Sequence, residues 1–259
     1  MTYLEFHLFF ILPPIVALAV TRLFVHREVS YRTALGTIGV LCAIALIYTT
    51  PWDNYLVARS VWWYSDDRVI GSIGYVPVEE YLFFILQPIL AGLWLAVLPS
   101  NGGRGRLIGS MRRNGGLAGV LITVAGFWML REDSTLYMGL ILSWAGPVIA
   151  GQWVWFGDVF FRERRRWALG VAIPTLYLWV ADRIAIGNEI WIISDRYTTG
   201  ADIFGLPIEE AAFFLVTNLM VVQGLIMFQE RRQDLKEAPV EENFLGTRPP
   251  NYAASSSRK

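Results

Sequence analysis

The chain is poor in the residues that build disulfides and most metal sites. Cys42 is the only cysteine, and His7 and His26 are the only histidines. A single cysteine excludes a disulfide framework and a CxxC redox pair, and two histidines leave little for a His-based zinc site. Lysine occurs only as Lys236 and Lys259. Because both follow the last apolar stretch, a retinal Schiff base inside the membrane is excluded.

Charged residues are also scarce, and they balance. They make up 17% of the 259 residues, with 22 basic and 22 acidic side chains, whereas a soluble domain has roughly 25%. A neutral chain has no bias towards polyanions, so nucleic acid is not an expected partner. Hydrophobic residues reach 54% and aromatic residues 14%, which indicates a protein of the lipid bilayer.

Long apolar stretches recur along the chain. Most approach the roughly 20 residues that cross a hydrocarbon core, and each must be helical because lipid offers backbone groups no partner. The first lacks a basic leader and is expected to stay as a span. The sequence predicts an all-α polytopic membrane protein with about seven transmembrane helices. The predicted spans are 3–24, 33–50, 77–98, 115–130, 136–158, 167–186 and 206–228, of which the fourth is the shortest.

Basic residues gather in alternate connections between these spans. One set of connections holds 14 of them and the other set holds five. The positive-inside rule then predicts a cell-membrane protein with its N-terminus outside and its C-terminus in the cytoplasm, a parity that seven spans satisfy. The polar tail at 231–259 is predicted to be a disordered cytoplasmic segment.

An internal repeat links two stretches, 53–84 and 182–214. Both run through Asp, Trp, Ser-Asp, Gly, Pro-x-Glu-Glu and Phe-Phe in the same order, 129 residues apart up to the glycine and 130 from the proline onward. The repeat predicts a first half at 1–110 with three spans and a second half at 111–230 with four. A fainter third copy at 4–12 resembles 78–86.

Each repeat also contains aromatic and β-branched residues before its Pro-x-Glu-Glu motif. These residues, at 55–64 and 190–193, favour a short hairpin at the membrane interface. An ordinary aromatic belt explains the tryptophans equally well.

Two glutamates follow the proline in each repeat, namely Glu79, Glu80, Glu209 and Glu210. Carboxylates suit the first turn of a helix, which accounts for one acidic residue per helix. Helix capping does not account for two glutamates directly before an apolar run, where placing an ionised carboxylate in the membrane costs about 2.5 kcal/mol or more. All four are therefore predicted to be functional residues. The first of each pair is also expected to bond the hairpin or one of the arginines Arg59, Arg68, Arg183 and Arg196.

The second glutamate of each pair shares a helical face with aromatic side chains. Three, four and seven residues after Glu80 or Glu210 lie two phenylalanines and one polar residue. Aromatic faces stabilise cations, and a dry aromatic setting favours a neutral carboxylic acid, so the pattern suits protonation of an isolated alkene. The predicted cation-stabilising residues are Phe83, Phe84, Phe213, Phe214, Trp62, Trp63 and Trp191. The predicted supporting polar residues are Asp53, Asn54, Asp182, Arg183, Gln87, Thr217 and Asn218.

These motifs resemble those of the integral-membrane lycopene cyclases of bacteria, archaea and fungi. The resemblance covers about 1–230 and is carried by GYVPVEEYLFF at 74–84, FGLPIEEAAFF at 204–214, PWDNYL at 51–56 and ADR at 181–183. The chain looks like the form in which two small subunits are fused. The resemblance implies conversion of the linear ψ-ends of lycopene into β-ionone rings, giving γ-carotene and then β-carotene without net redox change.

A mechanism follows as a hypothesis from that resemblance. Glu80 or Glu210 protonates C2 of the terminal double bond, the C5=C6 bond attacks the C1 cation, and Glu79 or Glu209 removes the C6 proton. The aromatic residues shield the cations from water. Which glutamate is acid and which is base, the type of ring, and whether one or both ends react stay open.

Cofactors and partners follow from the same features. The glycines at 102–105 lack the last glycine of a dinucleotide fingerprint, so no cofactor and no metal are expected. Expected partners are lycopene, cyclic carotenes and the lipid bilayer, and the family also implies phytoene synthase or a desaturase.

Other classes of function remain open at this stage. A parallel-repeat membrane transporter is the non-enzyme alternative, and a carotenoid hydratase or elongase is the enzymatic one. A prenyltransferase is disfavoured because Asp66, Asp67 and Asp195 form no paired aspartate-rich motifs.

Overall fold

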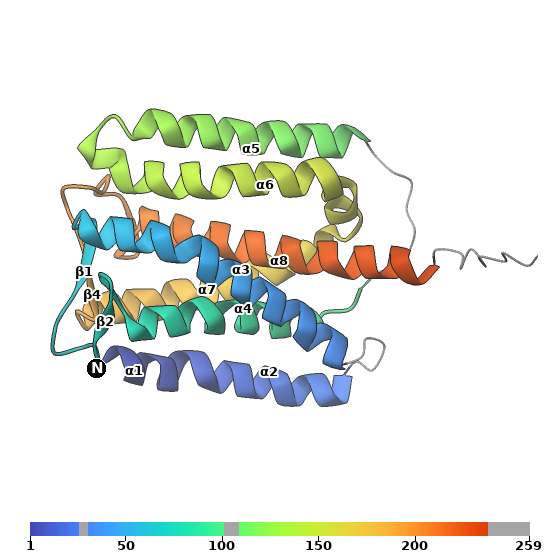
Figure 1. Ribbon diagram of the computed structural model, residues 1–259, viewed down its shortest axis with the longest axis horizontal. Helices are drawn as coiled ribbons and strands as arrows, with labels where there is room; N and C mark the ends of the chain where they lie inside the picture. The colour runs from blue at the N-terminus through green and yellow to red at the C-terminus, as the bar shows by residue number, and fades with distance from the viewer. Residues whose placement is uncertain (26–30, 101–108, 238–259) are drawn as a thin grey trace, which may run out of the picture.

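The computed structural model describes residues 1–25, 31–100 and 109–237, which form an elongated bundle of roughly aligned helices (Figure 1). The bundle begins with a continuous helical rod made of α1 (Tyr3–Phe6), the π-helix η1 (His7–Ile11) and α2 (Leu12–Val25). The remaining helices are α3 (Tyr31–Ala58), α4 (Val78–Val97), α5 (Gly109–Met129), the short η2 (Asp133–Thr135), α6 (Leu136–Arg162), α7 (Arg164–Gly187) and α8 (Ile208–Glu237).

Six helices in the described part of the chain are long and apolar enough to cross a membrane, which confirms the predicted all-α polytopic membrane class. They are Tyr3–Phe24, Leu35–Ala58, Val78–Val97, Asp133–Arg162, Arg164–Gly187 and Ile208–Arg232. The predicted span 115–130 is helical within α5 but is not one of the six.

Two predicted boundaries were wrong. The helix α3 continues through Pro51 to Ala58 instead of ending at 50, so Asp53 and Asn54 lie on its last turns. The helix α8 continues to Glu237, so the predicted tail does not begin at 231. The rest of that predicted disordered tail, 238–259, lies outside the described residues.

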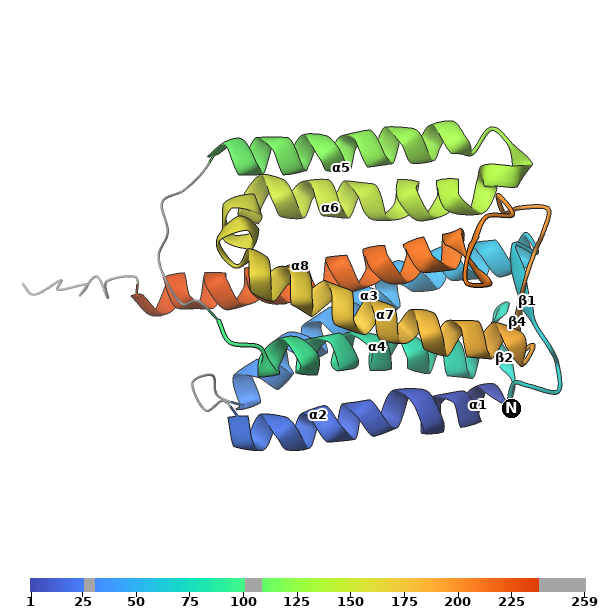
Figure 2. The same ribbon diagram turned by 180° about the vertical axis from the view of Figure 1, so that it is seen from behind.

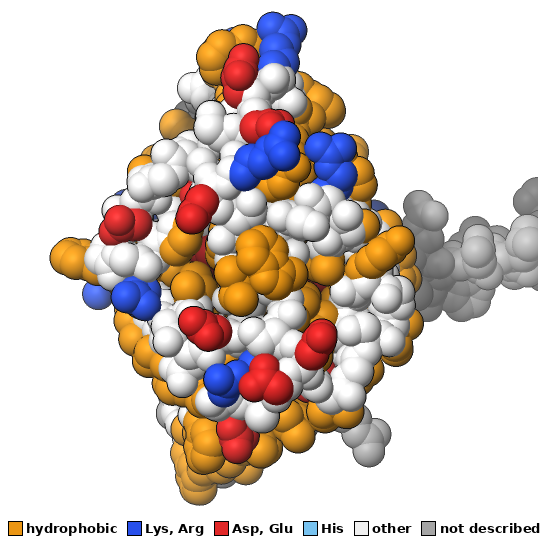
Figure 3. Space-filling view, turned by 90° about the vertical axis from the view of Figure 1, so that its left-hand side faces the viewer, with side chains coloured by type: hydrophobic (Ala, Val, Ile, Leu, Met, Phe, Trp, Pro, Cys, Tyr) orange, Lys and Arg blue, Asp and Glu red, His pale blue; other side chains and the backbone are white. Residues whose placement is uncertain are grey.

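The two ends of the bundle differ. Short strands and the N-terminus lie at one end, while the turn between α6 and α7 and the last turns of α8 lie at the other (Figures 1 and 2). The second end carries Arg162, Arg164, Arg165, Arg166, Arg231 and Arg232. We call the first end the strand end; its face carries scattered acidic and basic side chains (Figure 3).

The strand end contains two-stranded sheets that follow the sequence repeat. Strand β1 (Trp62–Tyr64) pairs antiparallel with β4 (Trp191–Ile193) from the other repeat. Each repeat then forms a hairpin, β2 (Ser72–Ile73) with β3 (Val76–Pro77), and β5 (Asp202–Ile203) with β6 (Leu206–Pro207). Of the segments 55–64 and 190–193 that favoured a short hairpin, residues 62–64 and 191–193 are strands that pair with each other across the repeats, while 55–58 is helical.

The pairing of β1 with β4 is two-fold symmetric. Trp63 lies opposite Ile192, its own counterpart in the repeat, with Trp62 opposite Ile193 and Tyr64 opposite Trp191. An antiparallel pair centred on equivalent residues relates the two halves by an approximate two-fold axis.

Backbone hydrogen bonds show which helices correspond. The amide of Tyr3 donates to the carbonyl of Arg68 (2.8 Å), and the amide of Tyr137 donates to the carbonyl of Tyr197 (3.1 Å). Since Arg68 and Tyr197 are counterparts in the repeat, the rod beginning at Tyr3 corresponds to α6. The faint third copy at 4–12 is therefore not a third repeat unit. Each unit consists of three long helices.

The helix α5 lies between the two three-helix units in sequence and runs along α6 (Figures 1 and 2). The contact is close because glycines bring the backbones together: a Cβ placed on Gly119 would lie 2.6 Å from Cα of Ala150.

This close contact predicts that Gly119→Ala lowers stability. The added methyl group meets backbone atoms that cannot move aside, which typically costs about 1–3 kcal/mol. The melting temperature in detergent measures the effect. Gly39→Ala on α3 is the matched control, because nothing lies within 4 Å of its Cβ position and alanine favours helix by about 1 kcal/mol. Equal melting temperatures for the two variants would contradict the prediction.

Candidate active site

Glu80 of α4 and Glu210 of α8 line the same small chamber of about 40 Å³ at the strand end. We call it the acid chamber. Its other walls come from both repeats and from the N-terminal rod: Tyr3, Trp62, Tyr64, Phe83, Tyr137, Asp182, Trp191, Ile193, Phe213 and Phe214. The structure therefore brings the two predicted acids into one site.

Tyrosine hydroxyl groups hold both glutamates. The hydroxyl of Tyr3 donates to Oε2 of Glu80, and that of Tyr64 donates to the same oxygen at 3.1 Å. The hydroxyl of Tyr137 donates to Oε1 of Glu210 at 2.6 Å. Each carboxyl group thus has a tyrosine from the first turn of its own three-helix unit.

The sequence repeat gives no sign of these tyrosines. Tyr3 and Tyr137 are 134 residues apart, whereas the repeat has an offset of 129 to 130, so they fall outside the visible match. Tyr64 has Ile193 as its counterpart, so the repeat gives no signal there either.

Tyr64 lies between the spans, on β1, where its hydroxyl group is enclosed. Burial, followed by the nearby Glu80 carboxyl, raises the pKa of Tyr64 well above its usual value of 10.0. Its hydroxyl therefore stays protonated and acts as a hydrogen-bond donor.

Two aspartates complete a buried carboxyl cluster. Asp53 of α3 is 1% exposed and Asp182 of α7 is 0% exposed, and both interact electrostatically with Glu80 and Glu210. Nε1 of Trp191 donates to Oδ1 of Asp182 at 3.0 Å. Among the described residues, no group of three or more His, Cys, Asp or Glu could hold a metal ion.

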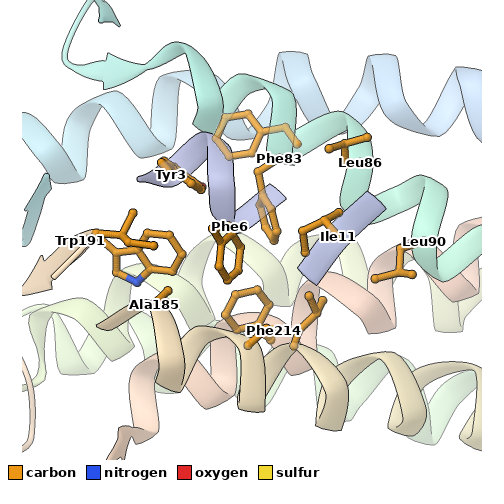
Figure 4. Packing of buried hydrophobic residues seen from close by; sticks show 13 residues of the cluster. Tyr3, Phe6, Ile11, Phe83, Leu86, Leu90, Ala185, Trp191 and Phe214 are labelled. Carbon is orange, nitrogen blue, oxygen red and sulfur yellow. The ribbon is translucent and has the colours of Figure 1, made fainter. Parts of the chain in front are cut away.

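Aromatic rings enclose this cluster. Phe83 and Phe214 meet edge to face with centroids 6.0 Å apart, and Phe6 packs against Trp191 with centroids 5.4 Å apart (Figure 4). Of the predicted aromatic residues, Trp63 is 41% exposed and does not line the acid chamber.

Glu79 and Glu209 do not line the acid chamber. Oε1 of Glu79 accepts the amide of Ile70 at 2.8 Å, and Oε1 of Glu209 accepts both the amide and the hydroxyl of Thr199 at 2.8 Å. Both side chains fasten the connection before their own helix. The expected bonds to arginine are not formed in the described part of the chain, and the prediction that these glutamates act as bases gains no support.

Two other predicted polar residues also hold the hairpins. Oδ1 of Asn54 accepts the amide of Tyr75 at 2.9 Å, and Nε of its repeat counterpart Arg183 donates to the carbonyl of Phe204 at 3.3 Å. These residues therefore contribute to the site through the loops that close it.

The remaining polar residues join helices deeper in the bundle. Nε2 of Gln87 donates to Oδ1 of Asn218 (2.7 Å), and Nδ2 of Asn218 donates to Oγ1 of Thr175 (3.1 Å). These bonds connect α4, α8 and α7. Thr217 instead bonds the carbonyl of Phe213 on its own helix (2.8 Å).

An apolar cavity of about 540 Å³ lies next to the acid chamber, between α3, α4, α6 and α8. Phe83 and Phe213 line both spaces, and Phe84, Gln87 and Thr217 line the cavity. Its wall on α8 runs from Phe213 to Arg231, which is about 27 Å at 1.5 Å per residue. The cavity thus leads from the carboxyl groups towards the basic end of the bundle.

The role of Glu209 as a fastener yields a prediction. Glu209→Ala leaves the amide of Thr199 without its partner, so the connection at 194–207 opens more often and trypsin cleaves faster after Arg196. Glu209→Gln keeps an oxygen that accepts this bond and should digest like the unmodified protein. Identical digestion of both variants would contradict the assigned role.

The family model for lycopene cyclase matches residues 1–98 and 134–227. A lycopene beta-cyclase of Halobacterium salinarum is 47% identical over 230 residues, covering 88% of this chain and 95% of that protein. A bifunctional lycopene cyclase/phytoene synthase of Arthroderma gypseum is 35% identical and covers 86% of this chain, which spans 40% of that longer relative. The comparison with solved structures found no match.

The matched segments contain both three-helix units and every residue of the acid chamber, and α5 lies between them. With most of the chain matched by the family model and with a relative of 47% identity over nearly its whole length, the chain belongs to the lycopene cyclase family.

Proposed function

We propose that the chain is a lycopene beta-cyclase that closes the ψ-ends of lycopene into β-ionone rings in the acid chamber. The main support is that two glutamates, one from each repeat, line the same aromatic chamber beside a long apolar cavity. Each of them accepts a hydrogen bond from a tyrosine hydroxyl. The name of the relative from Halobacterium salinarum supports this activity.

The chemistry needs a proton donor where water is absent. Glu80 or Glu210 donates a proton to C2 of the terminal double bond, which leaves a tertiary cation at C1. The C5=C6 bond attacks C1, and loss of the C6 proton restores a double bond. The rings of Phe83, Phe213 and Phe214 stabilise the cations, each by up to about 2 kcal/mol when desolvated. Because the reaction is a net isomerisation, it consumes no redox cofactor.

The apolar cavity provides the binding site for the polyene chain. At about 40 Å³ the acid chamber is far smaller than the apolar cavity of about 540 Å³, so the length of the polyene lies in the cavity and only its end reaches the acid chamber. Phe83 and Phe213 separate the two spaces, and we propose that these rings move apart as the ψ-end enters.

The position in the cell follows from the same features. We propose a multi-pass protein of the cell membrane, with the strand end outside and the basic end in the cytoplasm. The fungal relatives carry phytoene synthase in the same chain, which supports a neighbouring enzyme of carotenoid synthesis as a partner.

Expression in bacteria that make lycopene tests the function. We expect β-ring carotenes, identified by chromatography and absorption, from the unmodified chain. At least one of Glu80→Gln and Glu210→Gln should lower the yield about a hundred-fold or more, because it removes the carboxyl proton that the acid donates and general acid–base groups typically contribute 10²–10⁴-fold.

Glu79→Gln and Glu209→Gln are matched controls. The amide oxygen of glutamine can still accept the backbone hydrogen bonds, so these variants should keep most of the activity. Full cyclisation by both Glu80→Gln and Glu210→Gln would refute the proposed acids. A hydroxylated or elongated carotenoid from the unmodified chain would point to a hydratase or an elongase instead.

A shared chamber also predicts the order of products. Because Glu80 and Glu210 act in the same space, a molecule must leave and return with its other end first to receive a second ring. We expect monocyclic γ-carotene to accumulate before β-carotene in a time course, and more so when lycopene is in excess. Bicyclic product formed without a monocyclic phase would contradict this.

A further inference from the structure

A base has to remove the C6 proton, and the acid chamber contains a carboxyl group to which no role has yet been given. Asp182 lies on α7 and lines the acid chamber together with Glu80 and Glu210. It is 0% exposed. The two glutamates originally predicted as bases, Glu79 and Glu209, bond loop amides instead.

The side chain of Asp182 is held in one orientation. Oδ1 accepts a hydrogen bond from Nε1 of Trp191 at 3.0 Å, while Oδ2 has no hydrogen-bond partner among the described residues. A buried carboxyl oxygen without a partner lowers the stability of a protein, and a catalytic role is one reason for which such a group is kept. Here one oxygen is anchored and the other is available to accept a proton.

Asp53, the repeat counterpart of Asp182, also has a buried Oδ2 without a partner among the described residues, but it differs from Asp182 in its place and in its neighbours. Asp53 is buried but does not line the acid chamber. Within the described residues, Trp62 donates no hydrogen bond to Asp53; its ring packs instead against Trp52 and Tyr137, with centroids 5.8 and 5.0 Å apart. The two halves are therefore specialised, and the aspartate of the second half is the one at the reacting space.

We propose that Asp182 is the general base of the cyclisation and removes the proton from C6. This inference rests on the proposed function. After the C1–C6 bond has formed, the electrons of the C6–H bond become the new C5=C6 double bond. The proton passes to Oδ2 of Asp182. One glutamate has lost a proton and Asp182 has gained one, so transfer of this proton back to the glutamate restores the site.

The position of the base determines the type of ring. The C5 cation gives a β-ring when the proton leaves C6, an ε-ring when it leaves C4, and a γ-ring when it leaves the methyl group on C5. Because Trp191 holds Oδ1, Oδ2 has one orientation and selects one of these protons. The ring type of the product therefore reports on Asp182 directly.

The test uses the full chain in lycopene-producing bacteria and compares four variants with the unmodified protein. Asp182→Asn keeps an oxygen for the bond from Trp191 but cannot take up the proton. We expect at least a ten-fold loss of β-ring product, with ε-rings, γ-rings or an alcohol among the remainder. Asp182→Glu keeps the carboxyl group and should recover β-ring product.

The other two variants control for location. Asp202→Asn makes the same change on the exposed hairpin, where the asparagine oxygen can still accept the amide of Gly205, and should behave like the unmodified chain. Asp53→Asn should lower the yield without changing the ring type, because Asp53 acts on the glutamates and not on the substrate. The amount of each variant in the membrane and its melting temperature in detergent show whether it has folded.

The possible outcomes separate the two proposals. If the unmodified chain makes no cyclic product, the proposed function fails. If the unmodified chain makes β-rings, and folded Asp182→Asn also makes only β-rings, whether fast or slowly, then Asp182 is not the base. A change of ring type in Asp53→Asn equal to that in Asp182→Asn would also overturn the assignment. Should Asp182→Asn fail to fold, Trp191→Phe provides the test, because loss of the indole donor lets the carboxyl group of Asp182 rotate. We expect this variant to produce a mixture of ring types. Pure β-rings from Trp191→Phe would overturn the proposal.

Discussion

The structure depends on satisfying carboxyl groups inside an apolar helical bundle. Such groups are expensive in a membrane unless they are paired or bonded. Here the tyrosines at the starts of the first rod and of α6 donate to Glu80 and Glu210. The strand pair β1–β4 and the two hairpins then close the strand end above these groups. The same contacts that make the glutamates tolerable also exclude water from them.

Approximate symmetry brings the acids together, and departures from it differentiate them. Glu80 accepts two tyrosine hydroxyls, whereas Glu210 accepts one, because Ile193 stands where the first repeat has Tyr64. Trp191 orients Asp182, while Trp62 has no such bond to Asp53 in the described residues. An acid–base reaction needs groups with different roles, and two halves with different partners provide them.

The local features of this fold could be predicted from the sequence, but the contacts between distant segments could not. Hydropathy predicted the six long apolar helices of the described residues, together with a seventh span at 115–130 that is not one of them. The repeat drew attention to the glutamate pairs, and helical periodicity to the second glutamate of each. The repeat could not indicate Tyr3 and Tyr137, whose spacing differs from its offset, nor that β1 pairs with a strand 129 residues away. The proline before each pair placed Glu79 and Glu209 at the start of their helices. Only the folded loops show that the backbone amides of Ile70 and Thr199 donate hydrogen bonds to these carboxyl groups.

The strand pair centred on Trp63 and Ile192 has an evolutionary consequence. Two identical three-helix chains meeting about a two-fold axis would join the same strand to its own copy, and would place one glutamate from each chain at the axis. Such a dimer is an ancestor compatible with the present arrangement. Joining its copies head to tail through α5 would preserve the ancestral interface while allowing each copy to mutate independently.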